Sequence, residues 1–295
     1  MASGSLALVM LGLAPIILMR TRWCDVSPRV GIILWYGCGI LGWCSVLTFG
    51  AALMTLPMAG SLFRNVSSVF MGLVSGRQVE DLGLFEAVGL TIVFDVLTMV
   101  LGGWTVGCLN LKRRQMRHCE MLDLLSDFDD TLGAAVIDHP RPLAYYAAGR
   151  GGRVVLSRGT FGVVPQQELR AILEHERGHQ TGRHDLWALP LASASAFLTF
   201  IPYSRLAPQA IRCLLEMAAD DVAMRSVGRT VLLSALKSAK VFDTPASGAL
   251  AWDGQVIERR ISRLENAEVG AAALLYAHTA LLLAYGTLAW IWLSN

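Results

Sequence analysis

Long apolar segments constrain the fold of this chain more than any other feature. They run from Ala2 to Met19, from Val30 to Met58, from Phe85 to Leu111 and from Ala271 to Leu293. Each approaches or exceeds the about 20 residues that an α-helix needs to cross a bilayer. Only 16% of the residues are charged, against about 25% in ordinary soluble domains. The sequence therefore predicts a multi-pass α-helical membrane protein with four transmembrane helices.

Positive charges between these segments predict an orientation. They cluster in the first loop, after the third segment and before the fourth: Arg20, Arg22, Arg29, Lys112, Arg113, Arg114, Arg117, Arg259, Arg260 and Arg263. Cytosolic loops are enriched in lysine and arginine. The first apolar segment has no basic residue before it, so it does not resemble a signal peptide. We expect a bacterial inner-membrane protein with both termini outside. Residues 1–112 then hold three transmembrane helices, 113–265 a cytosolic domain, and 266–295 the fourth helix.

Charge and cysteine content exclude several other classes. The net charge of +2 is too small to indicate direct nucleic-acid binding. The six cysteines form no Cys-x-x-Cys pair and indicate neither a disulfide framework nor a zinc knuckle. The lipid bilayer is the first expected partner, and the oligomeric state is left open, a homo-oligomer included.

The predicted cytosolic domain contains the stretch HERGH, with His175 and His179 four residues apart and Glu176 directly after the first. Pro165 suits the first turn of a helix, and Glu168 complements its positive end. On a helix the two imidazoles lie about 40° apart and can reach one metal ion. Glu176 can then face the attacking water as general base. A pair of core or surface histidines is the alternative, so a third ligand has to decide.

That ligand is expected in the stretch LLEMAADDVA, on a helix that we expect to begin at Pro208. Glu216 completes a zinc site of two histidines and one carboxylate. Asp220, one turn later, can brace a ligand histidine through its distal N–H, and Asp221 is the alternative. An amphipathic helix with solvated acids is the competing interpretation. We expect one Zn²⁺ per chain.

Three residues are candidates for the second oxyanion donor: Tyr203, His184 and Arg212. Arg212 precedes Glu216 by one turn and could instead pair with it. His184 and Asp185 lie on another face of the helix from the ligand pair, which favours a structural or surface role for both.

These residues resemble the gluzincin pattern HExxH…ExxxD, and most of all the M56 peptidases, the family of the BlaR/MecR receptors. The similarity extends from about Phe85 to the C-terminus and includes DHPRPLAYYAAGRGGRVVLSRGTF and ERRISRL. It implies a cytosolic α+β zinc protease domain in which His175, His179 and Glu216 bind zinc, Glu176 is the general base and Asp220 supports a ligand. The receptors carry a penicillin-binding sensor domain after their last span. This chain has none, so we do not expect it to sense β-lactams through such a domain.

The resemblance implies a zinc metalloendopeptidase that cleaves a cytosolic protein in signal transduction, a BlaI-type transcriptional repressor by analogy. A quality-control protease similar to the HtpX/Ste24 branch is the alternative. A non-catalytic membrane scaffold is a third hypothesis, which survives only if the site binds no zinc.

The segment before the HERGH helix predicts a β-hairpin around Gly149–Gly152. We expect its second strand, formed by Arg153, Val154, Val155, Leu156 and Ser157, to be an edge strand that pairs with an extended substrate. The alternative is a strand that is paired on both sides within the domain.

Two further segments raise questions of topology. Residues 186–203 are apolar, yet a single crossing would put Glu216 about 30 Å of hydrocarbon away from His175. We therefore expect this segment to dip in and return, to lie along the interface, or to be domain core, with the site close to the inner membrane surface. In the external loop 59–84, apolar residues at helical spacing predict an amphipathic helix resting on the outer membrane surface. A second hypothesis is that its face, including Phe63 and Phe70, docks a separate sensor or ligand.

Overall fold

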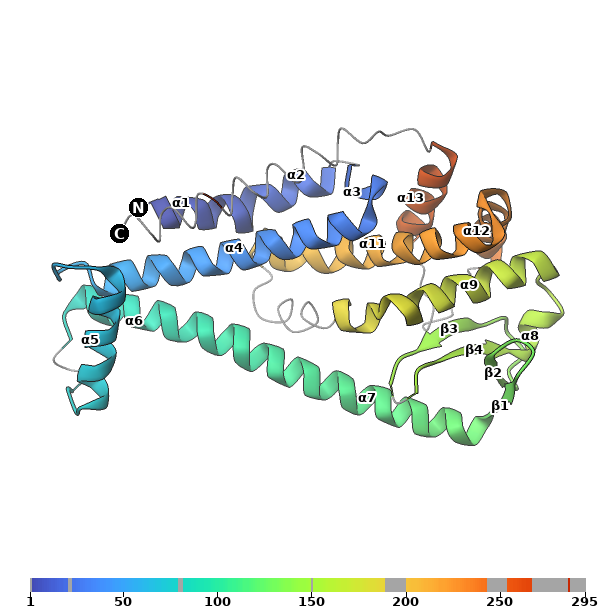
Figure 1. The fold of residues 1–295 in the computed structure, drawn as a ribbon, viewed down its shortest axis with the longest axis horizontal. Helices are drawn as coiled ribbons and strands as arrows, with labels where there is room; N and C mark the ends of the chain where they lie inside the picture. Colours follow the sequence, from blue (N-terminus) through green and yellow to red (C-terminus); the bar gives the residue numbers. More distant parts are fainter. Residues whose placement is uncertain are drawn as a thin grey trace.

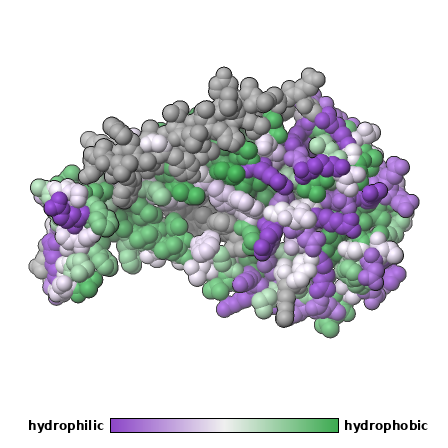
Figure 2. Space-filling model, viewed as in Figure 1, coloured by the Kyte–Doolittle hydropathy of each residue, from purple (hydrophilic) through white to green (hydrophobic). Residues whose placement is uncertain are grey.

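A computed structural model describes residues 2–20, 23–78, 82–149, 151–188, 200–242 and 254–266, together with Gly286. Figure 1 shows an elongated molecule with a helical bundle at one end and a mixed helix–sheet unit at the other. Hydrophobic side chains cover much of the bundle in Figure 2, whereas hydrophilic ones gather at the helix–sheet end. This segregation is typical of a membrane-embedded part joined to a water-exposed part.

Three helical stretches among the described residues are long and apolar enough to cross a membrane: Ser3–Arg20, Pro28–Met54 and Leu84–Leu125. The first consists of α1 (Ala2–Leu8), η1 (Val9–Leu13) and α2 (Ala14–Arg20). The short α3 (Trp23–Val26) leads to α4 (Pro28–Met54). The third consists of α6 (Leu84–Leu97), η3 (Thr98–Gly102) and α7 (Gly103–Leu125). These agree with the first three predicted spans, and the predicted fourth, 271–293, lies outside the described residues.

Glycines allow helices to approach α4 closely. A Cβ at Gly42 would lie 2.4 Å from a methyl carbon of Leu11 in η1, and one at Gly39 would lie 2.2 Å from the Tyr203 hydroxyl oxygen. Any side chain at these two positions would therefore displace a neighbour. As a result the first two candidate spans and the later helix α11 (Pro202–Val227) share one apolar core, which includes the fully buried Trp35.

The helix α5 (Leu62–Val74) forms in the predicted external loop, at the end of the bundle far from the sheet, and runs across the direction of α4 (Figure 1). Phe63 and Phe70 are 78% and 63% exposed. The predicted amphipathic helix is therefore present, and its apolar side chains are accessible. A role for Phe63 and Phe70 in receiving a signal stays a prediction.

A four-stranded sheet follows α7. Its strands are β1 (Ser126–Asp129), β2 (Ala134–Ile137), β3 (Ala144–Ala147) and β4 (Arg153–Ser157), in the order β1-β2-β4-β3. β3 and β4 form the predicted hairpin. The edge-strand prediction for Arg153–Ser157 was wrong, because β4 pairs with β2 on one side and with β3 on the other. Within the hairpin the edge strand is β3, and the opposite edge of the sheet is β1.

Helices complete the unit beside the sheet. The short α8 (Arg158–Phe161) precedes α9 (Gln166–Gly182), which carries the HERGH stretch. They are followed by α11, α12 (Arg229–Phe242) and α13 (Gly254–Glu265). α11 begins at Pro202, earlier than predicted, and contains Pro208 within its first turns. Its first half packs on α4, and its second half packs on α9 (Figure 1).

The described flanks of the apolar segment 186–203 both lie beside α4. The Tyr36 hydroxyl donates a hydrogen bond to the Trp187 carbonyl, and the Tyr203 ring lies 6.4 Å from that of Trp35. Both flanks therefore meet α4 at the same level, near Trp35 and Tyr36. Residues 189–199 themselves lie outside the described part, so the predicted alternatives for their path are not distinguished.

Candidate metal centre

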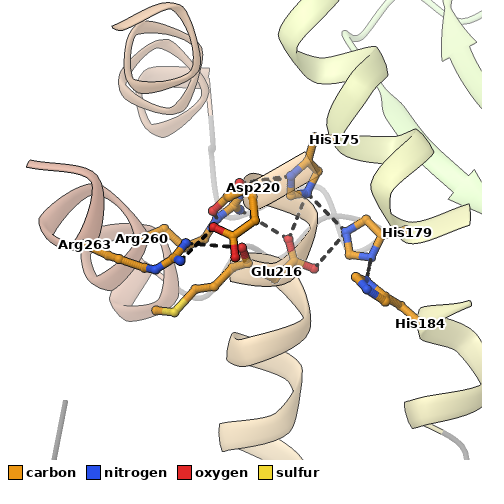
Figure 3. A network of polar contacts seen from close by, with 9 residues as sticks. His175, His179, His184, Glu216, Asp220, Arg260 and Arg263 are labelled. Carbon is orange, nitrogen blue, oxygen red and sulfur yellow. Dashed lines mark hydrogen bonds and ion pairs between the residues drawn. The ribbon is translucent and has the colours of Figure 1, made fainter. Parts of the chain in front are cut away.

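Three predicted ligands converge between α9 and α11 (Figure 3). His175 Nε2 lies 3.1 Å from His179 Nε2 and 3.2 Å from Glu216 Oε2, and His179 Nε2 lies 3.5 Å from Glu216 Oε1. The two histidines face the same way because they are one helical turn apart. Glu216 reaches them because α9 and α11 touch: a Cβ at Gly178 would lie 2.9 Å from Ala219 Cα. The small residues of both helices permit this approach.

The donor set fits zinc. Tetrahedral bonds of about 2.05 Å require donor atoms about 3.3 Å apart, and the three distances bracket that value. Two imidazoles and one carboxylate are also the donor types of catalytic zinc sites, which keep a fourth position for water or substrate. His175, His179 and Glu216 can therefore hold one Zn²⁺.

A buried ion pair stands behind the first ligand. Asp220 Oδ1 lies 3.0 Å from His175 Nδ1, and Arg260 of α13 donates two hydrogen bonds to the Asp220 carboxylate, at 2.5 and 2.7 Å. Both side chains are only 1% exposed. Arg260 Nη1 also lies 3.3 Å from Glu216 Oε2. The predicted role of Asp220 as the brace of a ligand histidine agrees with this geometry, and Arg260 adds a cation that orients it.

The charges of the site depend on these contacts. Burial raises the pKa of Asp220, but Arg260 and His175 lower it to about 2. Burial likewise opposes ionisation of Glu216, yet His175, His179 and Arg260 hold its pKa well below the ordinary value. Burial and Arg260 lower the pKa of His175, whereas Asp220 and Glu216 raise it, to about 9 overall. Because zinc binds neutral imidazole, metal binding competes with protonation of His175.

Glu176 is held by the edge strand. Its Oε2 accepts a hydrogen bond of 2.7 Å from the backbone N–H of Tyr146 in β3, and the residue is only 5% exposed. One carboxylate oxygen is thus oriented by the sheet. Glu176 lies on the helix that carries both histidines, but it is not one of the three converging ligands. A general base needs this position, close to the metal ligands and free to accept a proton.

His184 lies behind the second ligand. Gly182 ends α9, and Arg183 has a left-handed conformation (φ 49°) that turns the chain back. The His184 ring then reaches His179, with the two Nδ1 atoms 2.9 Å apart. Burial, followed by the nearby His179, lowers the pKa of His184 to about 3, so this imidazole is neutral. The structural role expected of His184 is therefore to orient the ligand His179.

The other candidates are placed elsewhere. Tyr203 is buried against α4, and Asp221 pairs with Arg263 of α13 at 2.7 Å rather than with a histidine. In the part of the chain that the structure describes, Arg212 has no ion pair with Glu216. The described geometry therefore identifies no second oxyanion donor among Tyr203, His184 and Arg212.

Sequence reasoning missed the cation at the centre of the site. Arg259, Arg260 and Arg263 were interpreted as loop charges that orient the chain and as part of the similar stretch ERRISRL, without a role at the site. In the structure Arg259 pairs with Asp25 of α3 at 2.7 Å, and Arg260 and Arg263 pair with the two aspartates of α11. The three acids Glu216, Asp220 and Asp221, close together on a helix with a buried face, were the available signal, because buried carboxylates require partners.

The helical His-x-x-x-His pair, the converging glutamate and the adjacent carboxylate define a zinc metallopeptidase site on an α+β scaffold. Residues 112–237, which contain the sheet, the HERGH stretch and Glu216, match the model of peptidase family M48, a family of zinc metallopeptidases. No curated protein and no solved structure matches the chain. The predicted zinc metallopeptidase is therefore confirmed, and the apolar helices indicate that it is associated with a membrane.

The finer family assignment is not confirmed. The match is to M48, whereas the sequence motifs were interpreted as M56 of the BlaR type, which is a different family. HERGH and ExxxD are features of gluzincins in general, so they do not separate these two families. The match favours the HtpX/Ste24-like alternative over the receptor-like interpretation.

Proposed function

We propose that the protein is a membrane-anchored zinc metalloendopeptidase that cleaves polypeptide segments at the inner membrane surface, in the manner of an HtpX/Ste24-like quality-control protease. One observation carries the proposal: the ligand helix α11 lies against the candidate span α4. A Cβ at Gly31 would lie 3.0 Å from Leu214 Cδ1, and Gly31 is in the first turn of α4. Glu216 follows Leu214 by two residues, so the site lies level with the end of a span.

This level favours substrates that are close to the membrane. Arg20 and Arg29 flank the same end of the first two spans, where basic residues mark the cytosolic interface. A soluble substrate would have to approach the bilayer surface to be cleaved, whereas a juxtamembrane segment is already there. The predicted orientation, with termini outside and the catalytic unit in the cytosol, belongs to this proposal.

The chain's own residues supply the following chemistry. His175, His179 and Glu216 would hold zinc, which when bound polarises the attacking water and the scissile carbonyl. Glu176 takes the proton of that water and passes it to the leaving amine. The Tyr146 N–H keeps the carboxylate in place during both transfers.

Substrate alignment is assigned to β3 rather than to β4. Only one side of β3 is paired within the sheet, and the Tyr146 N–H on its other side points to Glu176. Ala144 is two residues earlier, so its N–H faces the same way. An extended substrate pairing with this edge would lie across the metal ligands.

The test compares the wild-type protein with Glu176→Gln in native membranes. Zinc analysis of the purified chain separates an enzyme from a scaffold, because a scaffold would bind no stoichiometric zinc. Proteins that accumulate in the Glu176→Gln strain then identify the substrates. We expect several membrane-associated proteins. A single soluble transcriptional repressor would contradict the quality-control proposal and restore the signalling alternative.

A further inference from the structure

One face of α11 carries polar side chains beyond the metal site. Arg205, Gln209 and Arg212 precede Glu216 by eleven, seven and four residues, so all four lie within an arc of about 60° around the helix. Arg205, Gln209 and Arg212 are exposed. The opposite face is buried in the apolar core shared with α2 and α4, through residues such as Ala207, Ile211 and Leu214. We call Arg205, Gln209 and Arg212 the arginine face.

The two arginines of this face have no anionic partner among the described residues. The carboxylates around the site are already taken: Asp220 and Asp221 pair with Arg260 and Arg263, and Asp25 pairs with Arg259. Within the described part of the chain, neither Arg205 nor Arg212 forms an ion pair. The arginine face can therefore accept a carboxylate from outside the described fold.

The arginine face extends to the depth of the candidate spans. α11 runs antiparallel to α4, since Leu214 meets Gly31 and Tyr203 meets Gly39. Arg205 precedes Leu214 by nine residues, so it lies about 13 Å further along α4. A charged side chain at this depth is costly unless water or a polar partner meets it.

The arginine face is also continuous with the metal site. Gly178 of α9 lies opposite Ala219, and α9 ends at Gly182, one turn later. α9 thus covers the second half of α11, and the arginine face begins where α9 ends. A polypeptide leaving the metal site along α11 would meet Arg212 first and Arg205 last.

We propose that the arginine face of α11 is a substrate-binding subsite that selects acidic side chains; this inference rests on the proposed peptidase function. Arginine binds carboxylates with two parallel hydrogen bonds, and Gln209 can bind the backbone of an extended chain between them. Along the helix, Arg212 lies about 6 Å and Arg205 about 16 Å from Glu216. An extended chain advances about 3.3 Å per residue, so acidic residues are selected about two and about five positions from the scissile bond.

The experiment uses the full chain in nanodiscs of zwitterionic lipid, with zinc bound. Its probes are two peptide libraries of random sequence, each with two fixed residues three positions apart. The fixed residues are both Glu in one library and both Gln in the other, and mass spectrometry identifies the cleavage sites. Wild-type protein should prefer the Glu library, with the acidic residues about two and five positions from the cut. In Arg212→Gln and Arg205→Gln the ratio of kcat/KM between the libraries should fall about ten-fold.

Arg225→Gln is the matched control. Arg225 is also exposed on α11 but follows Glu216 by nine residues, which places it on the opposite face. It should keep the wild-type ratio. A third library carries Lys at the fixed positions. Arg212→Glu should prefer this library to the Glu library, which is an outcome that a misfolded variant cannot produce.

Two outcomes overturn the inference and leave the proposed function intact. The first is zinc-dependent cleavage of both libraries with equal kcat/KM by wild-type protein. The second is that Arg205→Gln and Arg212→Gln weaken binding to phosphatidylglycerol vesicles but leave the library preference unchanged. That result would assign the arginine face to lipid headgroups. The proposed function fails as well if zinc-loaded wild-type protein cleaves neither library, so that its peptidase activity is no higher than that of Glu176→Gln.

Discussion

The acidic residues in the second half of α11 and the arginines in its first half differ in how their charges are satisfied. In the second half Glu216, Asp220 and Asp221 each contact a histidine or an arginine from α9 or α13. In the first half Arg205 and Arg212 are exposed, and no ion pair forms with them among the described residues. One continuous helix thus combines a preorganised metal site with a surface that can still accept a ligand.

Zinc binding at the second half of α11 should be lost completely when one ligand is removed. Glu216→Ala and His175→Ala each leave two protein ligands, which is fewer than the three of catalytic zinc sites. We expect zinc content to fall to background and proteolysis to disappear, as measured by metal analysis and peptide cleavage of the purified chain. Stoichiometric zinc in Glu216→Ala would mean that another residue is the third ligand.

Removing the base should separate metal binding from chemistry. Glu176→Gln keeps the shape of the side chain but cannot accept the proton, so we expect activity to fall by about 10²–10⁴-fold. Zinc content should stay at the wild-type level. Full activity of this variant would rule out the role of Glu176.

Breaking the buried pair behind His175 should affect folding as well as metal binding. Arg260→Met removes the guanidinium partner of the buried Asp220 carboxylate, and breaking a buried ion pair in this way costs about 3–5 kcal/mol of unfolding free energy. Loss of an outer partner of a ligand typically weakens metal affinity by about 10–100-fold. Chemical denaturation and zinc titration measure the two effects.

The double variant Arg260→Met/Asp220→Leu sharpens the result. Apolar residues can replace a buried ion pair without loss of stability, so unfolding free energy should recover. Zinc affinity should stay weak, because His175 has still lost its brace. Recovery of both quantities would show that Asp220 does not orient the ligand.

The sheet provides a matched pair of proline substitutions. Val155→Pro places proline in the interior strand β4, where it removes a ladder hydrogen bond, so we expect a misfolded domain. Ala144→Pro removes an N–H from the free edge of β3, so zinc content should persist while kcat/KM falls. Unchanged peptide cleavage in a folded Ala144→Pro would contradict substrate pairing at this edge.

The stability of the first half of α11 should depend on its packing against α4. Gly39→Val would clash with the Tyr203 ring, and overpacking of this kind costs about 1–3 kcal/mol. We expect lower thermal stability in nanodiscs and reduced cleavage, with recovery in Gly39→Val/Tyr203→Ala. Failure of the second substitution to rescue the first would show that α11 does not rest on α4 at this point.

The smallest effect at working pH concerns Asp220. Its pKa is lowered from 3.8 to about 2, so in the metal-free chain its ionised form contributes about 2 kcal/mol of stability above pH 4. That contribution is lost as pH falls from about 4 to about 2, and it is constant between pH 5 and 7. Denaturation of wild type and Asp220→Asn across pH 2–5 tests this, and a difference in unfolding free energy that stays the same from pH 5 to pH 2 would contradict it.

Local patterns in the sequence predicted much of this molecule. Apolar length identified the first three candidate spans. Helical periodicity placed His175 and His179 on one face of their helix, and Glu216 and Asp220 on one face of the next. The Gly149–Gly152 turn predicted the β3–β4 hairpin. These inferences succeed because each depends on residues close together in the chain, where helix and turn geometry fix the spacing.

Long-range contacts decided the rest. Whether β3 or β4 is the edge depends on β2, which joins the sheet from outside the hairpin. The partner of Asp220 is 40 residues away on α13, and the first half of α11 packs on a span that precedes it by more than 150 residues. Charge complementarity could indicate that such partners exist, but only the packed fold selects which ones meet, because many arrangements satisfy the same local patterns.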